Sequence, residues 1–224
     1  MASTALISYD GTENDDDALA LGKMLAGAGF SLALAYIRHS REFDPGREQL
    51  AQHDAEQRLD RGATLLDDPD VPRHIVFGAS TGERLGELAA SEGASVVVFG
   101  SDYRTSPGHV APGRSAQHLL DGSSVAVAIA AAGLRTQIGE SIRAIAVPRA
   151  GPVSDVARQT ARALAEKLGA SVLDTPDGAA QLIVVGSQPA APPGRIAVGG
   201  DVREELDRAR GSVLVLPAEV PLLP

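Results

Sequence analysis

The chain has no cysteine and no tryptophan among its 224 residues. Without cysteine, the sequence excludes disulfides, thiolate metal sites and cysteine nucleophiles. Aromatic residues make up only 3% of the chain, so the core must be built from valine, isoleucine, leucine and alanine. Such aliphatic cores suit parallel sheets that are buried on both faces.

Long apolar runs and an excess of positive charge are also missing. No stretch reaches the roughly 20 apolar residues that a transmembrane helix needs. The N-terminal residues, MASTALISYDGTENDDD, lack the basic and apolar regions of a signal peptide, so we expect a cytoplasmic protein. The net charge of −9 argues against binding to nucleic acid or to acidic membranes.

Short apolar runs alternate with helical patterns along the first 130 residues. The apolar runs predict five strands, at residues 4–9, 30–37, 74–78, 95–100 and 125–130. Helical spacing predicts a helix in each of the four connections, and Pro45 and Gly46 are assigned to the loop before the second helix. The alternation predicts a doubly wound, parallel, five-stranded sheet of the α/β class. Ligands bind such sheets beyond the carboxyl ends of the strands.

The last third of the chain repeats part of this pattern. The strand LIVVG at 182–186 matches VVVFG at 96–100. Each run is followed by a serine, and a further glycine stands thirteen positions after the run's last glycine. Each loop then leads to a helix and a closing strand, SSVAVAIA at 123–130 and GSVLVLP at 211–217. Matched units of strand, loop, helix and strand indicate an internal repeat.

We therefore predict two domains, a complete one at residues 1–132 and a shortened copy of the same fold at residues 139–220, here called the first lobe and the second lobe. The second lobe has only TPDGAAQL where the first has a helix, a strand and another helix. The two closing strands are well suited to pair within one chain as a pseudo-dimer. A homodimer of such chains stays open.

Two motifs of the first lobe lie at expected strand ends. The first strand ends in Tyr9-Asp10-Gly11-Thr12, and the fourth is followed by Gly100-Ser101-Asp102-Tyr103-Arg104 and later Pro112-Gly113-Arg114-Ser115. In this context the motifs resemble those of the universal stress protein family, over residues 4–131 and in reduced form over 142–217. The family pattern has a glycine where Tyr103 stands and a serine or threonine where Arg114 stands.

The resemblance implies that the first lobe binds ATP or another adenine nucleotide, as the binding members of the family do. The implied site consists of Asp10, Gly11, Ile37, Gly100, Ser101, Arg104, Gly113, Arg114 and Ser115. Glycines let backbone N–H groups approach phosphate oxygens without a Cβ clash, and Asp10 would accept hydrogen bonds from adenine or ribose. Arg104 and Arg114 would pair with phosphates or stay solvated, and Tyr103 would block the groove or stack on a base.

Other features have alternative interpretations. The acidic run Asp15–Asp17 has two interpretations, a metal site or a favourable interaction with the positive end of a helix dipole, and we favour the second.

The loop after the fourth strand offers further alternatives. The histidines in or after it, His109 and His118, would contact phosphate or lie on the surface. Ser101 would be a nucleophile or a backbone contact. In the second lobe, Pro148-Arg149 replaces Asp10-Gly11, so we expect no nucleotide there. No metal site is expected.

Three functions remain open. The first is a stress-response regulatory protein that binds an adenine nucleotide in the first lobe and uses the second lobe as a built-in partner. The second is an interaction module of the same fold that binds no nucleotide. The third is a weak ATPase, ranked last because the sequence shows no general base beside a nucleophile. We therefore expect a binding protein and not an enzyme.

Overall fold

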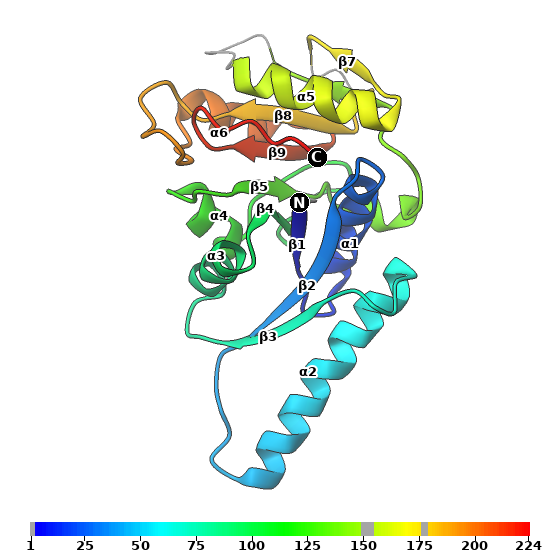
Figure 1. Cartoon of the computed structure of the whole chain (residues 1–224), viewed down its shortest axis with the longest axis vertical. Coiled ribbons are helices and arrows are strands. Elements are labelled where there is room, and N and C mark those ends of the chain that lie inside the picture. The colour runs from blue at the N-terminus through cyan, green and yellow to red at the C-terminus, as the bar shows by residue number, and fades with distance from the viewer. Residues whose placement is uncertain (1–2, 149–154, 176–178) are drawn as a thin grey trace.

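The strands of the computed structural model, which describes residues 3–148, 155–175 and 179–224, form one nine-stranded sheet (Figure 1). Its strand order is β3-β2-β1-β4-β5-β9-β8-β6-β7. Within the described residues, neighbouring strands run parallel except β5 and β9, which are antiparallel. The predicted α/β class with a mostly parallel sheet is confirmed.

The first lobe follows the predicted order of elements. These are β1 (Thr4–Ser8), α1 (Glu13–Ala26), β2 (Ser31–Arg38), α2 (Pro45–Leu66), β3 (Arg73–Phe77), α3 (Thr81–Ser91), β4 (Ala94–Phe99), α4 (Arg114–Leu120) and β5 (Ala126–Ile129). The chain adds β2 and β3 on one side of β1, then crosses over to add β4 and β5 on the other. The direction of winding therefore reverses between β1 and β4, the point at which doubly wound sheets bind ligands.

The second lobe has fewer elements. These are β6 (Ala144–Ala146), α5 (Asp155–Leu168), β7 (Ser171–Leu173), β8 (Leu182–Gly186), α6 (Gly200–Arg208) and β9 (Ser212–Leu216), after a 3₁₀ helix at Leu134–Gln137. The order β9-β8-β6-β7 has the same winding as β5-β4-β1-β2. Arg149 and residues 176–178 of TPDGAAQL, which entered the sequence argument, lie outside the described residues.

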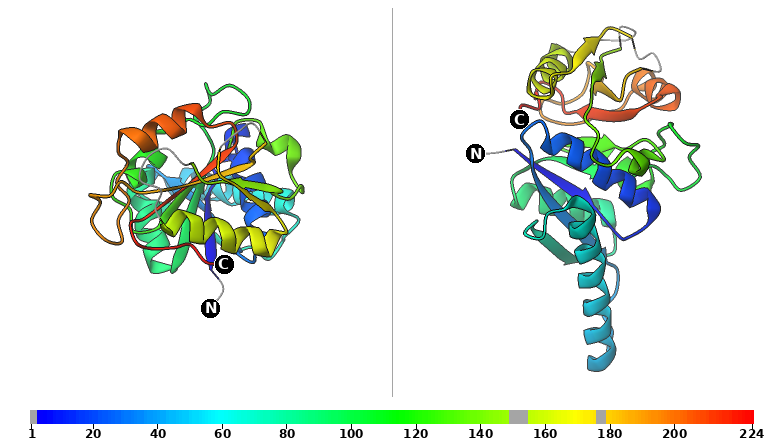
Figure 2. Two further views of the ribbon diagram at one scale, coloured as in Figure 1. Left: turned by 90° about the horizontal axis from the view of Figure 1, so that it is seen from above. Right: turned by 90° about the vertical axis from the view of Figure 1, so that its right-hand side faces the viewer.

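Helices cover both faces of the sheet. The helices α1, α2 and α5 pack on one face, and α3, α4 and α6 pack on the other. Seen from above, α5 and α6 lie on opposite sides of the strands (Figure 2). The buried side chains are mostly aliphatic, as the composition requires. No helix of the described part of the chain is both long and apolar enough to cross a membrane.

The closing strands join the two lobes. Val127 lies opposite Val215, Ala128 opposite Leu214, and the antiparallel ladder is buried along its length. The structure thus pairs the two strands for which pairing within the chain was expected. Burying both strands in one continuous sheet leaves neither as an exposed edge.

The start of α2 was predicted wrongly. Pro45 and Gly46 open this helix instead of lying in the loop before it. Asp44 caps the helix by accepting a hydrogen bond from the Arg47 N–H at 2.9 Å. Proline suits the first helical position because its missing N–H needs no partner there. The 22-residue helix therefore begins earlier, and its first turns project from the body of the molecule (Figure 2).

Candidate functional site

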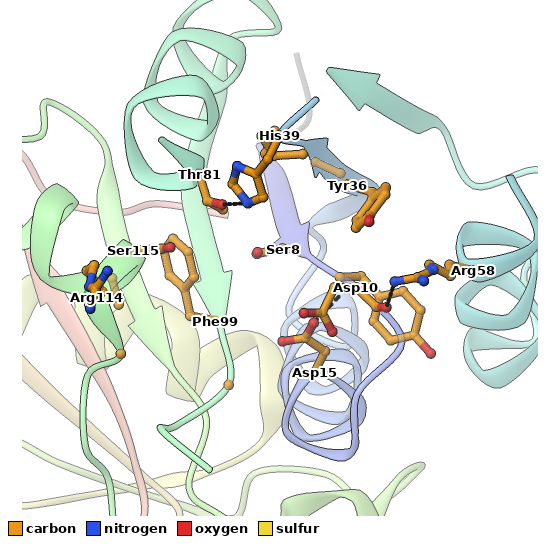
Figure 3. A pocket seen from close by; sticks show the side chains of 16 residues that line it. Ser8, Asp10, Asp15, Tyr36, His39, Arg58, Thr81, Phe99, Arg114 and Ser115 are labelled. Atoms are coloured by element: carbon orange, nitrogen blue, oxygen red, sulfur yellow. Dashed lines mark hydrogen bonds between the residues drawn. The ribbon is translucent and has the colours of Figure 1, made fainter. Parts of the chain in front are cut away.

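A cleft of about 280 Å³ opens at the carboxyl ends of β1, β2 and β4 (Figure 3). It lies at the point where the winding of the first lobe reverses, which is the expected place for a ligand. Six of the nine predicted site residues line it, namely Asp10, Ile37, Gly100, Gly113, Arg114 and Ser115. These residues come from segments that are far apart in the sequence.

The other three predicted residues do not line the cleft. Gly11 forms the turn after β1 with a φ of +88°, a conformation that favours glycine. The Arg104 guanidinium stacks 4.9 Å from the centre of the Tyr103 ring, and its Nε donates to the Tyr103 hydroxyl at 2.7 Å. Tyr103 is 70% exposed outside the cleft, so it does not block the groove.

Ser101 is buried and holds the loop to the closing strand. Its hydroxyl donates to the Ala130 carbonyl at 2.7 Å and accepts from the Ala111 N–H at 3.3 Å. The structure does not bring it into the cleft, either as a ligand contact or as a nucleophile.

The second lobe repeats this arrangement. Ser187 donates to the Leu216 carbonyl at 2.8 Å and accepts from the Ala197 N–H at 3.1 Å. In both lobes the carbonyl partner lies 29 residues after the serine and the N–H partner lies 10 residues after it. The glycine–serine motif shared by the two loops therefore fixes each loop to its closing strand.

The loop glycines differ in what surrounds them. A Cβ built on Gly100 would clash with the backbone oxygen of Asn14, because the start of α1 passes directly against the end of β4. Among the described residues other than its two chain neighbours, a Cβ built on Gly113 would meet no atom within 4 Å. The φ of Gly113 is −69°, which any residue adopts. Packing within the chain therefore explains Gly100 and leaves Gly113 unexplained.

Two carboxyl groups face each other at one end of the cleft, those of Asp10 and Asp15 (Figure 3). The Asp10 N–H donates to Asp15 Oδ2 at 2.6 Å, and the Asp10 Oδ1 accepts from the Thr12 N–H at 2.9 Å. Burial, followed by the interaction with the Asp10 side chain and its negative charge, raises the pKa of Asp15 to about 9, although the hydrogen bond from the Asp10 N–H acts in the opposite direction. Asp15 therefore holds a proton at neutral pH.

Replacing Asp15 by asparagine is expected to stabilise the protein at pH 8 by at least about 2 kcal/mol. The aspartate of the unfolded chain ionises near its ordinary pKa of 3.8, whereas the folded one keeps its proton up to about pH 9. Stability from this group therefore falls as pH rises between these values, and an uncharged asparagine avoids the loss. Urea denaturation at pH 4, 6 and 8 measures the effect.

The advantage of Asp15→Asn over the wild type should grow steadily from pH 4 to pH 8. Asp54, an exposed aspartate on α2, provides the matched control, and Asp54→Asn should track the wild type at each pH. A stability difference for Asp15→Asn that stays constant with pH would contradict the assignment.

The other two aspartates of the run have separate structural partners. Asp16 accepts from the Tyr9 hydroxyl at 2.9 Å and pairs with Arg61 at 2.8 Å. Burial and this hydrogen bond raise the pKa of Tyr9. Asp17 is buried against the segment between the lobes through hydrogen bonds to Gly133 and Arg135. The described residues contain no group of three His, Asp or Glu side chains placed to hold a metal ion.

The predicted site omits several residues that line the cleft, among them Tyr36, His39, Arg58 and Thr81, and also Asp15, which was interpreted as a partner of the helix dipole. Tyr36 and His39 flank the predicted Ile37 at the end of β2, which is a usable signal. Arg58 lies within α2, yet it stacks 5.3 Å from the centre of the Tyr36 ring and donates to the Asp10 carbonyl at 3.2 Å. No local pattern indicates such a long-range contact.

Comparison with known proteins gives one family and several similar folds. A family model described as the universal stress protein family matches residues 1–131. A universal stress protein from Archaeoglobus fulgidus DSM 4304 aligns with 97% of this chain and 99% of its own, at a TM-score of 0.72 and 15% identity. No curated protein sequence matches the chain significantly.

Two structures from Pseudomonas aeruginosa are also similar. A functionally unknown protein from strain PAO1 has a TM-score of 0.63, and a putative universal stress protein from strain UCBPP-PA14 has one of 0.62. Each aligns with 96% of this chain and 93% of its own chain, at 14% identity. At such identities the likeness concerns the fold, and it extends over both lobes.

Proposed function

The chain belongs to the universal stress protein family, and we propose that it is a stress-response regulatory protein whose first lobe binds ATP or another adenine nucleotide. The observation that carries the proposal is the cleft at the switch point of the sheet. Asp10, Ile37 and the segment Gly113–Ser115 meet there, although they come from three distant parts of the chain. Convergent polar groups in a concave site favour a small polar ligand.

The charges of the cleft suggest how the nucleotide lies. Asp10, Tyr36 and Arg58 gather at one side, and Arg114 and Ser115 gather at another (Figure 3). Carboxylates repel phosphates and accept hydrogen bonds from amino and hydroxyl groups, so the Asp10 side suits adenine and ribose. The guanidinium of Arg114 and the open backbone at Gly113 suit the phosphates.

We further propose that the second lobe is a shortened repeat that serves as a built-in partner of the first. Beside the β5–β9 ladder, the loop of each lobe contacts the residues just before the closing strand of the other lobe. His109 Nε2 of the first lobe contacts the Arg210 guanidinium, and the Ile196 N–H of the second lobe donates to the Ser123 carbonyl at 2.8 Å. Such reciprocal contacts are typical of a two-fold interface between similar units.

Titration of the purified chain with ATP in a calorimeter tests the nucleotide site. We expect Asp10→Ala to weaken binding by about 10- to 100-fold, because it removes a charged acceptor whose hydrogen bonds are worth about 1.5–3 kcal/mol. Asp54→Ala, an exposed change outside the cleft, should bind like the wild type. If the wild type shows no heat of binding at millimolar ATP, the proposed site is wrong.

The second candidate function is an interaction module that binds no nucleotide. The shared serine contacts favour it, because they explain the repeated loop motif without any ligand. The same titration separates the two functions, since an interaction module would bind ATP neither as the wild type nor as the Asp10→Ala variant.

A further inference from the structure

The first turns of α2 project from the body of the molecule and form an arm (Figure 1 and Figure 2). Two large apolar side chains lie uncovered on this arm. Phe43, directly before the residue that caps the helix, is fully exposed, and Leu50 in the second turn is 65% exposed. Large apolar side chains that are exposed on a projecting segment are typical of a contact with another protein.

The same face of the arm carries one charge of each sign. Arg47 and Asp54 are exposed and stand nearly two helical turns apart, so they lie on one face of α2 with Leu50 between them. Within the described part of the chain, neither side chain forms an ion pair. A second arm that runs antiparallel to the first reverses the order of the charges. Each arginine then faces the aspartate of the other copy, which makes the face complementary to itself.

A groove of about 180 Å³ lies beside this face, between α2 and the residues that follow β2. Tyr36, His39 and Arg58 line both this groove and the cleft of the first lobe, so the two are continuous. When the two charged pairs are in register, Phe43 of one arm lies opposite Arg58 of the other, beside the groove. An aromatic ring and a guanidinium in the wall favour the stacking of a further aromatic side chain.

We propose that two copies of the chain pair through their α2 arms about a two-fold axis, with Arg47 of each copy ion-paired to Asp54 of the other. Leu50 lies near the axis, where the two copies cover it, and Phe43 of each copy enters the groove of the other. This surface is separate from the closing strands, which already pair within one chain. It brings a side chain of one copy to the edge of the other copy's cleft. Because only the arms meet, the interface is small and the dimer is reversible.

Sedimentation equilibrium of the full chain, from about 1 µM to about 1 mM, tests the pairing, and we expect the wild type to pass from monomer to dimer. Arg47→Asp and Asp54→Arg each place like charges opposite one another, so each variant alone should dimerise at least about tenfold more weakly. An equimolar mixture of the two variants should dimerise like the wild type, because opposite charges face each other at both contacts of the mixed dimer. That recovery also shows that both variants fold.

Arg162→Asp and Glu166→Arg make the same changes of charge on an exposed face of α5, so both should dimerise like the wild type. Phe43→Ala should weaken the dimer about tenfold. A wild type that stays monomeric throughout the range would overturn the inference. So would a dimer that neither charge reversal on the arm weakens, or a mixture that associates no better than its components. In dilute solution the chain is monomeric and Asp54 is exposed, so its variants serve there as controls for stability and for ATP binding.

Discussion

Replacing Asp17 by asparagine is expected to lower the free energy of unfolding by about 3 kcal/mol. The Asp17 side chain is 1% exposed. It accepts hydrogen bonds from the backbone N–H groups of Gly133 at 2.8 Å and Arg135 at 2.7 Å, and it pairs with the Arg135 guanidinium at 3.1 Å. Asparagine lacks the charge and turns an NH₂ group toward these donors. Urea denaturation followed by circular dichroism measures the loss.

Glu13 gives a matched control on the same arginine. It pairs with Arg135 at 2.7 Å, but its side chain is 78% exposed. Exposed ion pairs contribute little because water and salt screen them, so Glu13→Gln should change stability by about 0.5 kcal/mol or less. Equal losses for the two variants, or a loss below about 1 kcal/mol for Asp17→Asn, would contradict the role of burial.

Asp17 also shows why part of this structure is hidden from the sequence. Its partner Arg135 lies 118 residues further along the chain, on the 3₁₀ helix that follows the first lobe. The run Asp15–Asp17 fits a helix N-terminus, and local reasoning stops at that interpretation. Only the folded chain gives each aspartate a different partner and makes Asp17 the anchor of the segment between the lobes.

The strands and helices themselves were predictable because their burial is regular. A parallel sheet covered on both faces requires continuous apolar strands, such as SVVVFG, and its covering helices repeat apolar residues at helical spacing. The boundaries were harder, because a proline both ends and begins helices. Pro45 was assigned to a loop, since the capping contact of Asp44 becomes visible only in three dimensions.

The candidate site was predictable where it lies at strand ends. Asp10 and Ile37 are such positions, and the cleft contains both. Ser101 directly follows the cleft-lining Gly100, and adjacent residues of extended chain point to opposite sides. Its hydroxyl therefore faces the closing strand, and the sequence did not reveal that direction. Thr81 was missed because it meets His39 only when α3 docks beside the end of β2.

Replacing Gly100 by alanine is expected to lower the free energy of unfolding by about 2–3 kcal/mol. The added methyl group would meet the Asn14 backbone oxygen. Backbone cannot rotate away as a flexible side chain does, so α1 and β4 must separate to make room. Both elements contribute buried side chains to the same hydrophobic cluster, so separating them would disturb the packing of that cluster. Thermal and urea denaturation measure the loss.

The same substitution at Gly113 should act on the ligand and leave the fold unchanged. Apart from its two neighbours in the chain, no described residue has an atom within 4 Å of the added Cβ, so stability should change by about 0.5 kcal/mol or less. The methyl group would instead hold phosphate oxygens away from the backbone N–H groups, and we expect about tenfold weaker ATP binding in the calorimeter. If Gly113→Ala binds ATP like the wild type, phosphates do not lie against this loop. If Gly100→Ala is as stable as the wild type, the close approach of α1 does not explain its glycine. The pair thus separates the glycine that the fold requires from the glycine that the proposed nucleotide site requires.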